Sequence, residues 1–264
     1  MSLPAPTADN RAVVTGASSG IGTALAEELA SRGYSLILVA RRGDLLTELA
    51  QRLTDRYGIT AEVRAVDLSD REQRAPLAKE LAARDIAILC NNAGVATFGP
   101  LAKLDLDYER AIMELNAVAV HDLSLAVLPG MLERRAGGIL ITGSAAGNMP
   151  IPNNTTYAAS KAFTNTFSES LRGELKGTGV NVTLLAPGPV RTDNPDQEEM
   201  GSKIPEFIWV TAAHTAKITI DALARNKMRV VPGLISKGMS IAGQFGPRSI
   251  TSVVAGAAYK KLGS

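Results

Sequence analysis

Residues 11–22 read RAVVTGASSGIG, and this stretch decides the fold. Its first part, RAVVT at 11–15, is an apolar run of strand length, and glycines separate it from a helical pattern of apolar residues. We expect Gly16 to form a tight turn, Gly20 to let a pyrophosphate approach the backbone, and Gly22 to let the helix pack close to the strand. The segment predicts a dinucleotide site in which helix amides hold the phosphates, lined by Gly16, Ser18, Ser19, Gly20, Ile21 and Gly22.

Strand-length runs continue along the chain and alternate with longer helical patterns. These runs are SLILVA at 35–40, AEVRAV at 61–66, IAILC at 86–90, GGILITG at 137–143, VNVTLLA at 180–186 and MRVVP at 228–232. Apolar strands joined by helix-length connections form parallel sheets that are covered on both faces. We therefore predict an α/β fold: a single doubly wound Rossmann-type domain over residues 1–264, with about seven parallel strands and a core at 11–232.

Composition narrows the class of protein. The chain has 264 residues, 45% of them hydrophobic and 20% charged, which is typical of a soluble globular domain. It has no uninterrupted run of about 18 apolar residues, and its first ten residues do not resemble a secretory signal. Cys90 is the only cysteine, and His121 and His214 have no partners at catalytic spacing. We expect a cytoplasmic protein without a metal site or a nucleic-acid partner.

The end of the second strand carries a charge that bears on the cofactor. SLILVA is followed by Arg41 and Arg42, where an acidic residue would receive the ribose hydroxyls of NAD. A guanidinium pairs instead with a 2′-phosphate, and Ser18 can add a hydroxyl donor. The sequence predicts NADP(H) over NAD(H), with solvated arginines as the alternative interpretation.

Tyr157 and Lys161 are four residues apart in TTYAASKAF, and Ser144 ends the strand pattern in ITGSAAG. On a helix the first two share a face, so the Lys161 ammonium is expected to lower the pKa of the Tyr157 phenol. Such a phenol can donate a proton to a carbonyl oxygen if another group supplies hydride. The set predicts carbonyl reduction or alcohol oxidation, although an isolated Tyr-x-x-x-Lys pair can also be an ordinary surface pair.

TGASSGIG, NNAG at 91–94 and the Ser144, Tyr157, Lys161 set together resemble the short-chain dehydrogenase/reductase family over Arg11 to Pro232. The resemblance implies that Ser144 orients the substrate oxygen and that Tyr157 is the general acid. Lys161 would hold the nicotinamide ribose, and NADPH would supply the hydride. The same resemblance adds these cofactor-binding residues: Asp67, Leu68, Asn91, Asn92, Ala93, Gly94, Tyr157, Lys161, Pro187, Gly188, Val190 and Thr192.

Asn116, in MELNAVAV, is similar to the family's helix asparagine. By that resemblance it perturbs its helix and holds a water that passes protons to the active-site lysine. The alternative is a mid-helix polar residue exposed to solvent. The family also pairs the tyrosine helix between subunits, which implies a homodimer or homotetramer.

The predicted function is NADP(H)-dependent interconversion of a small-molecule carbonyl compound and its alcohol, and the substrate is expected to be hydrophobic. One alternative is a 3-oxoacyl reductase acting on carrier-protein or CoA thioesters. Another, from a different class, is a regulatory module that senses NADP without turnover; such modules commonly lose the tyrosine or the lysine.

Two segments extend this prediction. Residues 193–210 combine charged and apolar side chains and are expected to form a lid over a hydrophobic substrate, or else a packed surface helix. No acidic residue follows Asp221, while seven Lys and Arg do. The extension at 233–264 could therefore lie on anionic membrane, which would make the protein membrane-peripheral, or cap a subunit interface.

Overall fold

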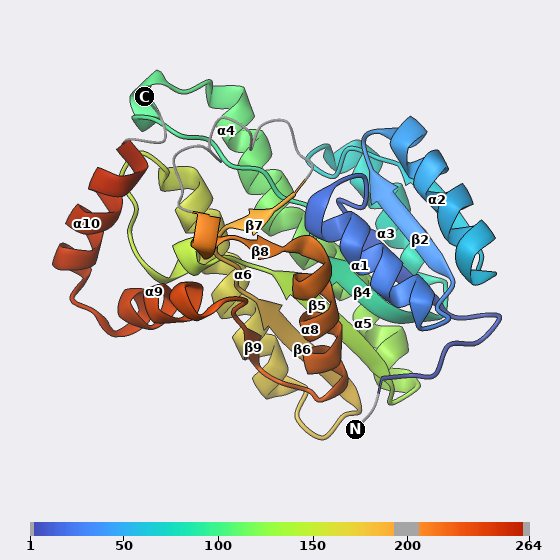
Figure 1. The fold of residues 1–264 in the computed structure, drawn as a ribbon. Helices are drawn as coiled ribbons and strands as arrows, with labels where there is room; N and C mark the ends of the chain where they lie inside the picture. The colour runs from blue at the N-terminus through green and yellow to red at the C-terminus, as the bar shows by residue number, and fades with distance from the viewer. Residues whose placement is uncertain (1–2, 193–205, 261–264) are drawn as a thin grey trace.

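The computed structural model describes residues 3–192 and 206–260, and a parallel sheet runs through its centre (Figure 1). The sheet has seven strands in the order β3-β2-β1-β4-β5-β6-β9, and every neighbouring pair is parallel. The strands are β1 (Arg11–Thr15), β2 (Leu36–Ala40), β3 (Ala61–Ala65), β4 (Ile86–Asn91), β5 (Gly137–Thr142), β6 (Val180–Leu185) and β9 (Arg229–Val230). Each lies within one of the predicted runs, except that β4 extends one residue beyond its run at 86–90, so the predicted sheet is confirmed.

Helices cover both faces of this sheet. One face packs on α1 (Gly20–Ser31), α2 (Gly43–Tyr57) and α8 (Ala212–Ala224). The other packs on α3 (Arg71–Ala82), α5 (Ala119–Glu133) and α6 (Thr155–Glu174). Each layer buries its own apolar cluster, because alternate strand residues point to opposite faces. The predicted doubly wound α/β architecture is confirmed.

The chain from α4 (Leu106–Met113) through a π-helical turn (Glu114–Val118) to α5 is one continuous helix. It spans 28 residues and is long and apolar enough, by composition alone, to cross a membrane. Ile112, Leu123 and Val127 are buried within the protein on its inner side, and α5 packs on β4 and α3. We therefore interpret it as a core helix of the α/β fold.

Two strands were not predicted. β7 (Val190–Arg191) and β8 (Val210–Thr211) form a small parallel sheet of their own, and a short 3-10 helix, Glu206–Ile208, precedes β8. The lid predicted at 193–210 falls mostly outside the described residues, which resume at residue 206. The extension beyond the last strand forms α9 (Leu234–Phe245) and α10 (Arg248–Lys260), which lie on the opposite side of the molecule from α2 in Figure 1.

The strand order reverses between β1 and β4, because β2 and β3 extend the sheet on one side and β5, β6 and β9 extend it on the other. At such a switch point the two connections leave in opposite directions and open a crevice beyond the carboxyl ends of the strands. The glycine turn follows β1, and NNAG spans the end of β4. The fold therefore brings these two motifs to one edge of the sheet.

Candidate active site

The glycine turn has the backbone geometry that its sequence predicts. Gly16 and Gly20 have φ of +66° and +58°, in the left-handed region that favours glycine. A Cβ on Gly22 would clash with the Gly16 carbonyl, so α1 packs directly on the turn. A Cβ on Gly20 would lie 2.7 Å from Cγ2 of Thr192, which places Thr192 across the turn.

Thr15 joins the glycine turn to the NNAG segment. Its hydroxyl oxygen accepts hydrogen bonds from the Asn92 and Ala93 amides at 2.9 and 3.0 Å, and the Asn92 side-chain amide donates to its carbonyl at 3.1 Å. A Cβ on Gly16 would lie 2.9 Å from the Ala93 Cα, so the two backbones are in close contact. Asn91 is buried and donates to the Ser124 hydroxyl at 3.0 Å. Asn91 therefore supports the floor of the crevice, while Ala93 and Gly94 form its wall.

Two arginines, Arg41 and Arg42, follow β2 and lie beside the glycine turn. Arg42 donates from Nη2 to the Ser18 hydroxyl at 3.0 Å, and both Arg41 and Arg42 are exposed. After the neighbouring strand β3, Asp67 accepts hydrogen bonds from the amide and hydroxyl of Ser69, and Leu68 is buried. These residues occupy the positions at which the adenosine end of a dinucleotide would lie on the carboxyl edge.

The residues present fit a dinucleotide phosphate group. Ser19 is the N-cap of α1, and its side chain makes no capping hydrogen bond to the first amides of this helix. Free amides at a helix N-terminus bind anions, and glycine at positions 16 and 20 leaves room for close approach. The residues that would hold the phosphates are those of the turn, and Arg42 with Ser18 would meet a 2′-phosphate.

Ser144, Tyr157 and Lys161 meet at the carboxyl edge beyond β5. Tyr157 and Lys161 lie on successive turns of α6, and the Tyr157 hydroxyl lies close enough to the Ser144 side chain to interact with it. Ser144 caps a 3-10 helix, Ala145–Asn148, by accepting from the Ala146 amide at 3.1 Å. The Lys161 ammonium donates to the Thr142 carbonyl at 2.8 Å. Two hydroxyls and one ammonium thus converge where a carbonyl oxygen could bind.

The pKa values of Tyr157 and Lys161 correct the expectation that the lysine lowers the pKa of the tyrosine. Burial raises the pKa of the Tyr157 hydroxyl above its usual value, and the hydrogen bond with Ser144 opposes this rise. The expectation that Lys161 lowers the Tyr157 pKa is wrong here, because the ammonium is 5.8 Å from the ring centroid and is directed to Thr142. Burial also lowers the pKa of Lys161 to about 8. Near neutral pH the site therefore holds a protonated phenol and a protonated amine.

Asn116 lies in the π-helical turn and is fully buried, so the alternative of a solvent-exposed asparagine is wrong. Its side chain donates to the Val95 carbonyl at 2.9 Å and to the Ser160 hydroxyl at 3.0 Å, and it accepts from the Val95 amide at 3.1 Å. A Cβ on Gly94 would lie 3.1 Å from Asn116 Oδ1 and 3.2 Å from Lys161 Nζ. Asn116 and Lys161 therefore flank the same point of the backbone, and only a glycine leaves the space between them open.

Asn165 is a site residue that the sequence interpretation missed. It lies on α6 one turn beyond Lys161, and it is buried. Its amide nitrogen donates to the Ser144 carbonyl at 2.9 Å, and its Oδ1 accepts from the Ser144 amide at 3.3 Å. This pair of bonds fixes the backbone that carries the Ser144 hydroxyl. The four-residue spacing of Tyr157, Lys161 and Asn165 was the available signal, since it puts all three on one helix face.

The segment after β6 approaches the site from the other side. The Pro187 carbonyl accepts from the Ala145 amide at 3.2 Å, which joins this segment to the Ser144 helix. A Cβ on Gly188 would clash with Ser236 of α9, and Val190 is buried in β7. Thr192 lies beside Gly20, so the segment after β6 reaches from the Ser144 helix to the glycine turn.

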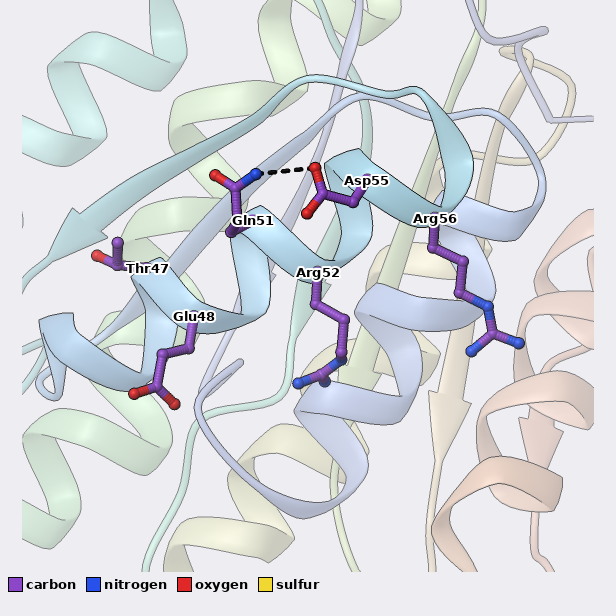
Figure 2. Close-up of a pocket in the computed structure, with 6 residues that line it drawn as sticks. All are labelled: Thr47, Glu48, Gln51, Arg52, Asp55 and Arg56. Atoms are coloured by element: carbon purple, nitrogen blue, oxygen red, sulfur yellow. Dashed lines mark hydrogen bonds between the residues drawn. The ribbon is translucent and has the colours of Figure 1, made fainter.

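The structure also has an open hollow along the outer side of α2 (Figure 2). Figure 2 shows its side chains spread along one helix, with Gln51 donating to Asp55 at 2.8 Å. The lining residues are Thr47, Glu48, Gln51, Arg52, Asp55 and Arg56. None of the predicted site residues is among them, so we interpret this hollow as a solvated helix face.

Comparison with known proteins adds independent evidence. Residues 10–201 match the family model described as short chain dehydrogenase. The chain belongs to this family. Over 185 residues it is 38% identical to a very-long-chain 3-oxoacyl-CoA reductase from Bos taurus, covering 69% of this chain and 59% of that protein.

Two further similarities span more of the related protein. A sulfoacetaldehyde reductase 2 from Chromohalobacter salexigens is 40% identical over 185 residues, which are 69% of this chain and 73% of that protein. A solved short-chain dehydrogenase from Sphingobium yanoikuyae in complex with NADPH has a TM-score of 0.80 and 30% identity, over 89% of this chain and 92% of that one. The chain spans about 60% of the length of the oxoacyl-CoA reductases it matches.

Proposed function

We propose that this protein is an NADP(H)-dependent oxidoreductase that interconverts a hydrophobic carbonyl compound and its alcohol. The observation that carries this proposal is that the Tyr157 hydroxyl lies beside the Ser144 side chain, with Lys161 on the next turn of α6, all at the sheet edge that holds the glycine turn. Membership of the short-chain dehydrogenase family supports the same reaction class.

The residues of this site divide the reaction between them. The chemistry that NADPH would supply at this site is a hydride for the carbonyl carbon. The Ser144 hydroxyl orients the carbonyl oxygen, and Tyr157 donates its proton to that oxygen, so that the alcohol forms as the phenol becomes phenolate. The raised pKa of Tyr157 keeps the donor protonated before reaction. The Lys161 ammonium, which remains protonated below about pH 8, would hold the nicotinamide ribose beside Tyr157.

The preference for NADP(H) over NAD(H) rests on Arg42 and Ser18. Their hydrogen bond at 3.0 Å holds a guanidinium and a hydroxyl beside the glycine turn, where they would share a 2′-phosphate. No carboxylate stands at the two positions after β2, because these are Arg41 and Arg42. The NADPH in the Sphingobium yanoikuyae neighbour supports this assignment.

A 3-oxoacyl-CoA thioester is the second substrate candidate, favoured by the bovine relative. Apolar side chains next to the catalytic tyrosine favour a hydrophobic carbonyl in either case: Ile151 and Ala158 are buried there, with Met149 packed against them. The regulatory alternative, NADP sensing without turnover, is disfavoured because both Tyr157 and Lys161 are present and adjacent.

A carbonyl panel tests the proposal. Purified protein is incubated with NADPH or NADH and one of three substrates: a long-chain 3-oxoacyl-CoA, a bulky apolar ketone or a short charged aldehyde. Nicotinamide absorbance reports turnover. We expect turnover of an apolar substrate with NADPH and a lower kcat/KM with NADH. Binding of NADPH without turnover of any carbonyl would contradict the proposal and favour the sensor.

We also propose that the protein assembles as a homodimer or homotetramer through α5 and α6. Phe163 and Leu125 are 40% and 51% exposed on these helices, and a shallow groove runs between them. Phe163 stacks on Phe167 with ring centroids 5.7 Å apart, which makes a rigid apolar ridge. Light scattering of the wild type and of Leu125→Glu tests this, with a smaller assembly expected for the variant.

A further inference from the structure

The two C-terminal helices direct apolar side chains to the outside of the molecule. We define the C-terminal face as these exposed residues: Leu234, Ile235, Ile241 and Phe245 of α9, and Ile250, Val253 and Val254 of α10. Leu234, Phe245 and Val253 are 84%, 77% and 73% exposed. In Figure 1 the two helices form one side of the molecule, away from α2. This concentration of apolar surface indicates a binding partner.

The orientation of α9 is the reverse of an ordinary surface helix. Its buried side carries Ser236 and Ser240, and the Ser240 hydroxyl accepts a hydrogen bond from Asn148 at 2.9 Å. Its apolar side, with Leu234 and Ile241, faces outward. An amphipathic helix normally turns its apolar stripe to the core. The apolar stripe of α9 therefore faces away from the protein interior and is available to a binding partner.

α10 shows the same outward arrangement. Ile250, Val253 and Val254 are spaced three and four residues apart, so they form one stripe along the helix. All three are more than half exposed, while Ala255 on the other side is buried. Both helices therefore contribute to one outward apolar surface.

The charges around the C-terminal face indicate the nature of the partner. Lys237 and Arg248 are exposed on α9 and at the start of α10, and the sequence continues to Lys260 and Lys261. No acidic residue follows Asp221. In a two-fold contact the face would meet its own copy, which brings these cations together, and neither α9 nor α10 carries a carboxylate to pair with them. A surface of anionic lipid matches both the apolar stripe and the positive charge.

We propose that the C-terminal face docks on anionic lipid bilayers. The apolar side chains enter the boundary between head groups and acyl chains, and Lys237 and Arg248 contact the lipid phosphates. The inner side of the same helices is a wall of the candidate active site, because Ala255 packs in the cluster of Ile151, Ala158 and Tyr157. Docking thus places this side of the site at the lipid surface. That a hydrophobic substrate enters from the bilayer rests in addition on the proposed reductase function.

Vesicle co-sedimentation of the full chain tests the docking. The probes are vesicles of phosphatidylcholine alone and of phosphatidylcholine mixed with phosphatidylglycerol. We expect the wild type to bind the mixed vesicles, and added salt to weaken this binding because it screens exposed charges. We expect the double variant Phe245→Ser/Val254→Ser to bind at least about tenfold more weakly, since it removes apolar contacts with the bilayer. Lys237→Glu/Arg248→Glu should lose the preference for phosphatidylglycerol.

Two control variants make the same kinds of change, loss of an exposed apolar side chain and reversal of a positive charge, at positions outside the C-terminal face. Met228→Ser removes an apolar side chain that is 50% exposed next to β9, and Arg56→Glu reverses an exposed charge on α2. Both should bind as the wild type does. Wild-type protein that stays in solution with mixed vesicles, or equal binding by Phe245→Ser/Val254→Ser, would overturn the proposal.

A second copy of the chain is the competing occupant. Light scattering without lipid decides this: a wild-type dimer that Phe245→Ser/Val254→Ser converts to a monomer would also overturn the proposal. Vesicle binding requires neither cofactor nor carbonyl. Its failure would therefore leave the reductase proposal untouched, and inactivity in the carbonyl panel would leave the docking proposal untouched.

Discussion

Lys161 is a charged side chain that is held almost entirely away from water. It is 4% exposed, and burial lowers its pKa to about 8 from an ordinary value of 10.5. The unfolded chain therefore binds one more proton than the folded protein between these two pH values, so the free energy of unfolding rises as pH increases through this window. The full effect is on the order of 3 kcal/mol.

Substitution of this residue should remove the pH dependence. Lys161→Met keeps the length of the side chain and has no titrating group, so we expect it to be more stable than the wild type at pH 7 and to lose most of that advantage by about pH 10. Urea unfolding of both proteins across this range measures the difference. If the difference in the free energy of unfolding between the two proteins stays the same from pH 7 to about pH 10, Lys161 is not a buried ammonium.

Arg42 should determine the choice of nucleotide. A charge-assisted hydrogen bond contributes about 1.5–3 kcal/mol, so Arg42→Ala should lower kcat/KM for NADPH by roughly 10- to 100-fold and change kcat/KM for NADH little. Arg56→Ala removes the same charge from the exposed side of α2 and serves as the control (Figure 2). If the Arg42 variant loses activity equally with both nucleotides, the 2′-phosphate assignment is wrong.

At the residue scale, spacing alone predicted which side chains would meet. The four-residue interval put Tyr157 and Lys161 on one helix face, and the structure places Ser144 against Tyr157. The direction of the Tyr157 pKa shift was not predictable, because it depends on how deeply packing buries the phenol. Asn165 was also missed, since its bonds to Ser144 form only after α6 docks on β5.

At the scale of elements, Arg74 joins three segments. This buried arginine of α3 pairs with Glu114 and Asp122 at 2.9 Å each and donates to the Leu68 carbonyl at 2.7 Å. Glu114 begins the π-helical turn that holds Asn116. Arg74 therefore fixes this turn relative to α3 and to the strand end at Leu68.

Loss of this arginine should destabilise the fold. We expect Arg74→Met to lower the free energy of unfolding by about 2–3 kcal/mol, because it removes hydrogen bonds to two carboxylates and a buried carbonyl. Arg52→Met removes a surface pair with Glu27, in which both side chains are more than one-third exposed, and should cost below about 1 kcal/mol. Urea unfolding measures the free energy of unfolding of both variants. Equal losses would show that the buried contacts of Arg74 stabilise the fold no more than a surface ion pair does.

The main elements were predictable because their signals are local. Apolar runs marked all seven sheet strands, and helical patterns separated them. β7 and β8 are two residues each and lie outside the predicted strand runs, and they pair where 190–191 and 210–211 meet in space. The π-helical turn inside the helix from Leu106 to Glu133 changes the hydrogen bonding without changing the residue types, so periodicity did not reveal its position.

At the scale of the whole molecule, the order of the strands places the chemistry. The reversal between β1 and β4 opens the crevice in which the glycine turn and NNAG meet, and the loops after β5 and β6 bring in Ser144 and Pro187. The sequence predicted this edge from the alternation of strands and helices. It did not predict which side of α9 and α10 faces outward, because that depends on the residues that pack inward, Ser236 and Ser240 of α9 and Ala255 of α10.

The central claim is that Tyr157 transfers the proton to the substrate carbonyl, and Tyr157→Phe tests it most directly. The variant keeps the ring and removes only the hydroxyl, so its affinity for NADPH, measured by nucleotide fluorescence, should stay near that of the wild type. Its kcat for carbonyl reduction should fall by about 10²- to 10⁴-fold, the usual contribution of a general acid. A variant that binds NADPH and reduces the carbonyl at the wild-type rate would contradict the mechanism.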